Sequence, residues 1–323
     1  MRYRALGRTG LSVSEVGFGA WGIGGRTIAH TSYGDTDDSV SIAALRRAHD
    51  LGVTLFDTSA AYGSGHSEAL LGQAFGGSDR VVLATKAGYE AWDKSPDFSA
   101  AAIVASTEAS LRRLRSDRLD ILMLHNAPLE VLAAPDVQET MANLVRSGKV
   151  RCWGLSAKSP ADALAALAIH DLAVIQANFN MMDLRALTGG LFAELARRGV
   201  GFIARTPLCF GFLSGTITRE TVYPEGDHRL GWPRAQLENW IDGARDLLSA
   251  VGARAGLEAV HASIRYCLSF AEVSATIPGI LTPEQAEENA AASDLGPLAP
   301  IVLDRVAEIN RSRQFFVARA AGS

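Results

Sequence analysis

The feature that most constrains the fold is a regular alternation of short apolar segments with longer segments of helical periodicity. The apolar segments are hydrophobic at nearly every position, as buried parallel strands are. An alternation repeated eight times favours a closed parallel barrel with helices outside. We therefore predict an α/β fold, a (β/α)8 TIM barrel. The expected strands are residues 15–19, 54–57, 81–86, 120–125, 150–156, 174–177, 201–206 and 275–277, and the expected helices are residues 39–50, 100–115, 136–146, 161–168, 187–198 and 257–268.

Additional segments are expected besides the eight strand–helix repeats. Residues 3–13 have a glycine-rich centre and indicate an N-terminal β-hairpin. Residues 207–233 form a long Gly- and Pro-rich segment, typical of a functional loop. Residues 235–255 and 298–314 predict extra C-terminal helices. No linker divides the chain, and 323 residues suit one barrel of about 250 residues with insertions, so residues 1–323 are expected to form a single domain.

Charge and composition argue against several classes of function. The net charge is −4 and no basic block occurs, so nothing indicates binding to nucleic acid. No apolar run reaches about 18 residues, so no membrane span is expected. The N-terminus lacks the apolar stretch of a signal peptide, which makes the cytoplasm the expected location. Cys152, Cys209 and Cys267 form no CxxC pair, so we expect free thiols and no metal site.

A glycine motif near the N-terminus needs a separate judgement. Gly17, Gly19 and Gly22 form the G-x-G-x-x-G pattern of dinucleotide-binding Rossmann folds directly after an expected strand. That motif should open a helix, whereas the residues that follow are rich in Gly and turn formers. We therefore do not assign a Rossmann fold.

Polar residues recur where the expected strands end. In a parallel barrel the carboxyl ends of the strands meet at one face, where catalytic residues lie. Each residue alone has an ordinary explanation, such as a helix cap for an aspartate or solvation for a lysine. Their recurrence at successive strand ends favours an active site. The residues are Asp57, Lys86, His125, Ser156, Gln176 and Asn178, with Tyr62 in the turn after Asp57.

Four motifs in this order resemble the aldo-keto reductases. They are FDTSAAYGSGHSE, LATKAG, DILMLHN and CWGLS, and the order and spacing match across nearly the whole chain. The resemblance implies a (β/α)8 barrel, a nicotinamide cofactor bound without a Rossmann domain, and reduction of an aldehyde or ketone such as a sugar, a ring ketone or a natural-product carbonyl. It also implies a catalytic tetrad of Asp57, Tyr62, Lys86 and His125, with Tyr62 as proton donor. A homo-oligomer is a possible assembly.

These residue types suit the chemistry. A phenol has an ordinary pKa near ~10 and donates a proton reluctantly. A neighbouring ammonium favours the phenolate, so we predict that Lys86 lowers the pKa of Tyr62 while Asp57 keeps Lys86 charged. His125 can hydrogen-bond the carbonyl oxygen. Glu68 is expected to interact with a helix N-terminus, although the family motif also retains a Ser-Glu pair at this place.

The resemblance also implies the cofactor site. Ser156 and Gln176 would hold the nicotinamide carboxamide. Ala157 stands where the family often has Asn, so one hydrogen bond is lost or Asn178 replaces it. Arg205 stands where an aromatic residue often stacks on the nicotinamide, and it would either stack there or pair elsewhere. The loop 208–215 would hold the pyrophosphate and residues 278–289 the adenosine. The remaining predicted contacts are Gly19, Trp21, Asp57, Pro207, Leu208, Gly211, Leu213, Gly215, Gly279, Thr282, Gln285, Glu288 and Asn289.

The choice of cofactor stays open. Family habit favours NADP(H), whose 2′-phosphate usually meets a basic residue. Here Ile280 and Leu281 occupy that place, and no Lys or Arg occurs between Arg265 and Arg305, which makes NAD(H) plausible. For the substrate pocket we select Trp21, Tyr62, Trp92 and His125 from a wider aromatic set that adds Tyr89, Phe179, Phe210 and Trp232.

A regulatory role is the alternative. The family includes potassium-channel β-subunits, so a cofactor-sensing subunit with little turnover is the second hypothesis. The complete tetrad favours an enzyme.

Overall fold

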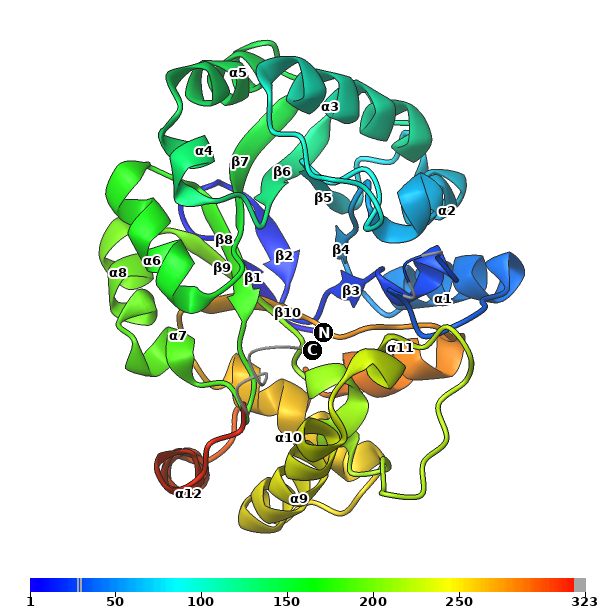
Figure 1. Ribbon diagram of the computed structural model, residues 1–323, viewed down its shortest axis with the longest axis vertical. Helices are drawn as coiled ribbons and strands as arrows, with labels where there is room; N and C mark the ends of the chain where they lie inside the picture. The colour runs from blue at the N-terminus through cyan, green and yellow to red at the C-terminus, as the bar shows by residue number, and fades with distance from the viewer. Residues whose placement is uncertain (28, 30, 317–323) are drawn as a thin grey trace.

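Eight parallel strands form the centre of the molecule in the computed structural model, which describes residues 1–27, 29 and 31–316 (Figure 1). They are hydrogen-bonded in chain order. This arrangement confirms the predicted (β/α)8 barrel. The strands are β3 (Phe18–Gly19), β4 (Leu55–Asp57), β5 (Val82–Ala87), β6 (Leu119–His125), β7 (Val150–Ser156), β8 (Val174–Asn178), β9 (Gly201–Arg205) and β10 (Val273–Ile277).

The sheet closes through backbone contacts between its first and last strands. Val16 pairs with Thr276 and Gly19 pairs with Gly279 as isolated parallel bridges. A Cβ on Gly19 would lie 2.9 Å from the carbonyl oxygen of Ile277, so glycine is needed for this approach. The strand predicted at residues 15–19 is therefore shorter than expected, because only Phe18 and Gly19 form continuous ladder pairs while Val16 forms a single bridge.

The predicted N-terminal hairpin covers the amino-terminal end of the barrel. It consists of β1 (Tyr3–Ala5) and β2 (Ser12–Ser14), which pair antiparallel. Leu6, Leu11 and Val13 are buried and pack with inward-facing strand residues such as Ile121 and Ile203. The barrel interior is thus a packed apolar core that is closed at this end, which leaves the carboxyl ends of the strands for a site.

Helices surround the barrel (Figure 1). Between the helices and the strands lies a second apolar cluster, larger than the one inside the barrel. Several begin at side-chain caps: Ser99 accepts from Ala102 N, and Ser159 from Asp162 N. The helices are α1 (Asp38–Asp50), α2 (His66–Phe75), α3 (Ala100–Leu114), α4 (Leu129–Ala133), α5 (Pro135–Arg146), α6 (Pro160–Ile169), α7 (Arg185–Thr188), α8 (Leu191–Arg198), α9 (Arg234–Val251), α10 (Leu257–Leu268), α11 (Pro283–Ala291) and α12 (Pro300–Ser312).

Two further expected segments differ in the structure. The helix predicted at residues 187–198 is divided into α7 and α8, because Gly190 adopts a φ of 85° that interrupts the helix. The loop at residues 207–233 contains two short 3-10 segments, η3 (Cys209–Ser214) and η4 (His228–Gly231). The extra C-terminal helices are present as α9 and α12.

The glycine motif does not open a helix. Only a 3-10 turn, η1 (Gly22–Gly24), follows β3. The three cysteines are free, and Cys209 and Cys267 are buried. Within the described ranges, no helix is both long and apolar enough to cross a membrane.

Candidate active site

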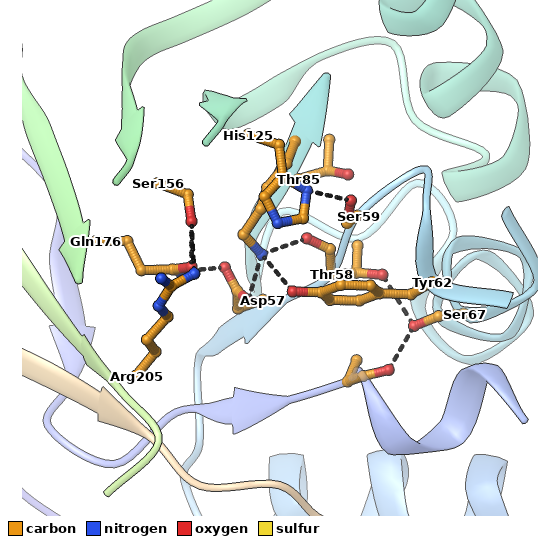
Figure 2. Close-up of polar contacts among 12 residues, drawn as sticks. Asp57, Thr58, Ser59, Tyr62, Ser67, Thr85, His125, Ser156, Gln176 and Arg205 are labelled. Carbon is orange, nitrogen blue, oxygen red and sulfur yellow. Dashed lines mark hydrogen bonds and ion pairs between the residues drawn. The ribbon is translucent and has the colours of Figure 1, made fainter. Parts of the chain in front are cut away.

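The four predicted catalytic residues come together at the carboxyl ends of β4, β5 and β6 (Figure 2). Lys86 lies at the centre. Its Nζ donates to Asp57 Oδ1 at 2.6 Å, to the Thr58 carbonyl at 2.8 Å and to Tyr62 Oη at 3.2 Å. The side chain of Lys86 is fully buried and that of Asp57 is 3% exposed, so the ion pair is shielded from water. Three acceptors therefore hold the ammonium group in one position.

The loop that carries Tyr62 depends on close backbone packing. Tyr62 begins the 3-10 segment η2 (Tyr62–Gly65), and Gly63 within it has a φ of 60°. A Cβ on Gly63 would lie 2.2 Å from the Gly24 carbonyl oxygen. The small residues after β4 thus let η2 pack directly on η1, and this contact sets the position of the phenol.

Burial changes the expected acidity of Tyr62. Lys86 does lower the pKa of the phenol, as predicted, but burial is the larger effect and the pKa is raised from its ordinary value of 10.0. The predicted lowering effect of Lys86 is confirmed, but the expectation of a net downward shift in the pKa of Tyr62 is wrong. The phenol is protonated at neutral pH, as a proton donor must be.

The neighbouring groups take opposite charge states. For Lys86, burial works to lower the pKa, but Asp57 and Tyr62 outweigh it and raise the pKa above 10.5. For His125, burial lowers the pKa well below 6.5, and the positive charges of Lys86 and Arg205 lower it further. The imidazole is accordingly neutral beside a charged ammonium group.

A second hydrogen-bonded group adjoins Asp57. Gln176 Nε2 donates to Asp57 Oδ2 at 2.7 Å, and Ser156 Oγ donates to Gln176 Oε1 at 3.1 Å. Arg205 lies against this pair (Figure 2), with Nη1 3.4 Å from Ser156 Oγ. The two predicted carboxamide-holding residues are therefore connected to the catalytic group through Asp57.

Arg205 is held by neutral oxygens. Its Nε donates to Asn178 Oδ1 and its Nη2 to the Ala157 carbonyl, both at 2.8 Å. Asn178 is thus a hydrogen-bond partner of Arg205. Its contact with the cofactor stays a prediction. Within the described part of the chain, no carboxylate oxygen lies within 4.0 Å of the guanidinium, and burial lowers the pKa of Arg205. Among these residues Arg205 thus pairs with neutral oxygens and not with a carboxylate, so its positive charge stays at the base of the site.

A cavity of about 940 Å³ extends from the catalytic group along the barrel mouth. Its volume lies toward the upper end of ligand pockets, which span about 300–1,000 Å³. Many predicted residues line it: Gly19, Trp21, Asp57, Tyr62, Trp92, His125, Gln176, Arg205, Pro207, Leu208, Gly211, Gly279, Gln285, Glu288 and Asn289.

Several predicted residues lie elsewhere. Ser156 and Lys86 are fully buried behind the cavity wall. Leu213 is buried in the main apolar cluster, and Gly215 lines a separate cavity of about 430 Å³ beside α9. Thr282 caps α11, where its hydroxyl accepts from Gln285 N at 3.3 Å. Leu213 and Gly215 are therefore poorly placed for ligand contact.

The aromatic residues divide in the same way. Trp21, Trp92 and Phe210 line the cavity. Tyr89 packs on Trp92 and His125, with ring centroids 5.0 and 5.7 Å away. Phe179 is fully buried in the core, and Trp232 packs on Trp240, so neither is among the lining residues.

One wall of the cavity was not predicted. Tyr33 and His228 pack against Trp21 with ring centroids 5.0 and 4.8 Å away. Burial raises the pKa of Tyr33 to about 12. Ser32 and Asp227 join the two loops through an isolated bridge. These loops have no periodic pattern, so sequence reasoning had only their Gly and aromatic content as a signal.

The far end of the cavity is suited to a nucleotide. Gln285 and Asn289 lie on α11, where Gln285 Oε1 accepts from Leu281 N at 2.8 Å and Asn289 Nδ2 contacts the Gly279 carbonyl at 3.5 Å. Among the described residues, neither Gln285 Nε2 nor Asn289 Oδ1 has a hydrogen-bond partner, so both atoms can contact a ligand. A Cβ on Gly279 would meet no atom within 4 Å, so the wall is open there. These donors and acceptors, with Gln176 lining the other end of the cavity, fit a nicotinamide dinucleotide.

Comparison with known proteins supports the same assignment. The model of the aldo/keto reductase family matches residues 15–311.

The chain belongs to the aldo/keto reductase family.

This aldo/keto reductase is similar to two curated bacterial proteins. It is 30% identical to aldo-keto reductase YhdN of Bacillus subtilis over 89% of this chain and 87% of that protein. It is 31% identical to the NADH-specific methylglyoxal reductase of Escherichia coli over 91% of this chain and 94% of that protein. The holo form of aldo-keto reductase AKR11C1 from Bacillus halodurans superposes with a TM-score of 0.76 at 25% identity and 96% coverage of both chains.

Family membership settles the general activity. The protein is an oxidoreductase that reduces carbonyl compounds with a nicotinamide cofactor.

Proposed function

We propose that this reductase converts an aldehyde or ketone to an alcohol, with Tyr62 as the proton donor. The supporting observation is the position of Lys86 Nζ, which lies 2.6 Å from Asp57 Oδ1 and 3.2 Å from Tyr62 Oη. A reduced nicotinamide bound in the cavity would supply a hydride to the carbonyl carbon. The carbonyl oxygen then receives the C=O electron pair and takes the proton of the Tyr62 hydroxyl.

The surrounding residues make this proton transfer favourable. The phenol is protonated before the reaction because burial raises its pKa. The phenolate formed by the transfer lies beside the Lys86 ammonium, which opposes the cost of a buried negative charge. Asp57 keeps Lys86 charged throughout. His125 lies near the phenol, with ring centroids 6.0 Å apart, and would orient the carbonyl oxygen.

For the cofactor, Ser156 and Gln176 would hold the carboxamide, and residues of the η3 loop and α11 would hold the rest. NADP(H) remains our first choice from family habit. NAD(H) is the supported alternative, because the cavity wall at Ile280 and Leu281 carries no cation and a 31% identical relative is named NADH-specific. Of the arginines among the lining residues, Arg229 is already paired with Asp227 at 2.6 Å.

The proposed substrate class follows from the cavity wall. Trp21 and Trp92 present apolar faces near the catalytic group, whereas Asn126 and Arg205 add polar surface. A partly apolar carbonyl compound suits this wall, and a sugar, a ring ketone or a natural-product carbonyl each has both kinds of surface.

Replacement of Tyr62 tests the function. Carbonyl-dependent oxidation of NADPH and NADH should be measured for the wild type and Tyr62→Phe across a panel of carbonyl compounds. We expect the variant to lose turnover by at least ~100-fold while both cofactors bind as in the wild type by fluorescence titration. Unchanged turnover in Tyr62→Phe would exclude the phenol as proton donor. A wild type that binds cofactor without reducing any compound would favour the regulatory alternative.

A further inference from the structure

Ser59 lies beside the catalytic tetrad without belonging to it. The residue is fully buried in the segment between Asp57 and Tyr62. Its Oγ lies 3.1 Å from His125 Nδ1 and accepts from Ala61 N at 3.2 Å (Figure 2).

The imidazole carries a single proton. Lys86 and Arg205 are the charged groups that act on His125, and both disfavour imidazolium, as does burial. The other rings that surround it belong to Tyr62, Tyr89 and Trp92, with centroids 6.0, 5.7 and 5.0 Å away. No carboxylate oxygen in the described ranges lies within ion-pair distance of His125. A neutral ring must hold its proton on either Nδ1 or Nε2.

The hydrogen bonds of Ser59 decide between these two forms. Ala61 N can only donate, so it cannot receive the serine hydroxyl proton. Of the partners seen for Ser59 Oγ in the described chain, His125 Nδ1 alone can accept it. A buried hydroxyl without an acceptor is costly. The arrangement that satisfies every group has Ser59 donating to Nδ1, which leaves the ring proton on Nε2.

We propose that Ser59 is a positioning residue that holds His125 in the Nε2–H form, with its N–H donor directed into the active-site cavity. His125 lines that cavity together with Tyr62. This inference rests on the proposed function, since the acceptor of the Nε2–H group is the carbonyl oxygen of the substrate. In the other form Nε2 would present a lone pair to that oxygen and repel it. Ser59 thus determines whether His125 attracts or repels the substrate oxygen.

Nitrogen NMR of the free protein tests the proton position directly. The protein should be labelled with ¹⁵N-histidine, and His125 among the seven histidines should be assigned by its loss in His125→Gln. We expect the wild-type Nδ1 shift in the unprotonated range and the Nε2 shift in the protonated range at neutral pH. In Ser59→Ala the two shifts should move toward each other as both forms become populated. A protonated Nδ1 in the wild type overturns the proposal.

Kinetics of the same variant test the consequence. We expect Ser59→Ala to lower kcat about tenfold, with KM for the carbonyl compound changed less than about twofold. The control is Ser67→Ala, since Ser67 is a buried hydroxyl near the same loop that bonds Thr58 and Ala20 instead of His125. The control should leave the His125 shifts as in the wild type. Equal effects of the two variants, or a Ser59→Ala enzyme with unchanged shifts and kcat, would overturn the assignment.

The two readouts separate this inference from the proposed function. The NMR shifts require neither cofactor nor turnover. If the wild type shows the Nε2–H form but reduces no carbonyl compound, the proposed function fails and the role of Ser59 in setting the tautomer stands.

Discussion

The buried ion pair between Asp57 and Lys86 provides the sharpest prediction. Asp57→Asn keeps the shape of the side chain but removes the charge 2.6 Å from a fully buried ammonium group. Removing one partner of such a pair typically costs about 3–5 kcal/mol, because the other charge stays buried without compensation. Lys86 then faces neutral acceptors alone among the described residues: the Thr58 carbonyl, the Tyr62 hydroxyl and the amide oxygen of the new asparagine. We expect a loss of this size in the free energy of unfolding at pH 6.

The loss should shrink as the pH rises. In the wild type the folded-state pKa of Lys86 is raised above 10.5, so the stability that Lys86 contributes is fully present at lower pH and constant between pH 6 and 9. Without Asp57, burial dominates and lowers that pKa below the unfolded value near ~10.4. The unfolded chain then binds more protons than the folded chain in the window between the two values. Stability of the variant should therefore rise by up to about 1.4 kcal/mol per pH unit in that window.

Urea denaturation followed by tryptophan fluorescence at pH 6, 7.5 and 9 measures this effect. Glu68→Gln is the matched control. Glu68 is a buried carboxylate that accepts from Arg113 Nε at 2.6 Å, and an arginine cannot lose its proton in this range. The loss in the free energy of unfolding of Glu68→Gln should be the same at all three pH values. A deficit in Asp57→Asn that is independent of pH, or one below about 1 kcal/mol at pH 6, would refute the reasoning.

Two further predictions concern the loop and the base of the site. Gly63→Ala should lower the free energy of unfolding by about 1–3 kcal/mol more than the control Gly77→Ala. Both glycines have a positive φ, but only Gly63 packs against the Gly24 carbonyl. Equal thermal midpoints of the two variants would contradict a role for this contact. Arg205→Met removes a buried positive charge without a carboxylate partner, so the oxidised, positively charged cofactor should gain about tenfold in affinity relative to the reduced form. Fluorescence titration of both forms measures the ratio, and an unchanged ratio would show that Arg205 does not act on the nicotinamide.

The grouping of the candidate catalytic residues could be predicted from sequence because parallel strands impose a common geometry. Asp57, Lys86 and His125 end or nearly end successive apolar segments, and the carboxyl ends of such strands must meet at one end of the barrel. Tyr62 follows from its short distance along the chain to Asp57. The break between α7 and α8 was missed because the apolar spacing continues across Gly190, and spacing does not report a left-handed residue.

Contacts between distant segments could not be predicted in this way. Glu68 lies in the first turn of α2, as expected, but the sequence gives no sign that it also pairs with Arg113 and accepts from Thr85 Oγ1 at 2.5 Å. The cavity wall built from Tyr33 and His228 joins residues nearly 200 positions apart in two loops without periodicity. The glycine-rich loop predicts cofactor contacts for Leu213 and Gly215, but Leu213 lies within η3, Gly215 directly follows it, and neither lines the cavity.

The order of apolar strands and helices, and the polar residue at each strand end, are properties of the sequence alone, and they determined the barrel and the identity of its four central residues. The acidity of Tyr62, the partners of Arg205 and the contact between Ser59 and His125 were decided only by the tertiary structure. The physical reason is that a pattern reports which side chains share a face, whereas a pKa or a tautomer depends on how much water is excluded and which dipole lies within about 3 Å.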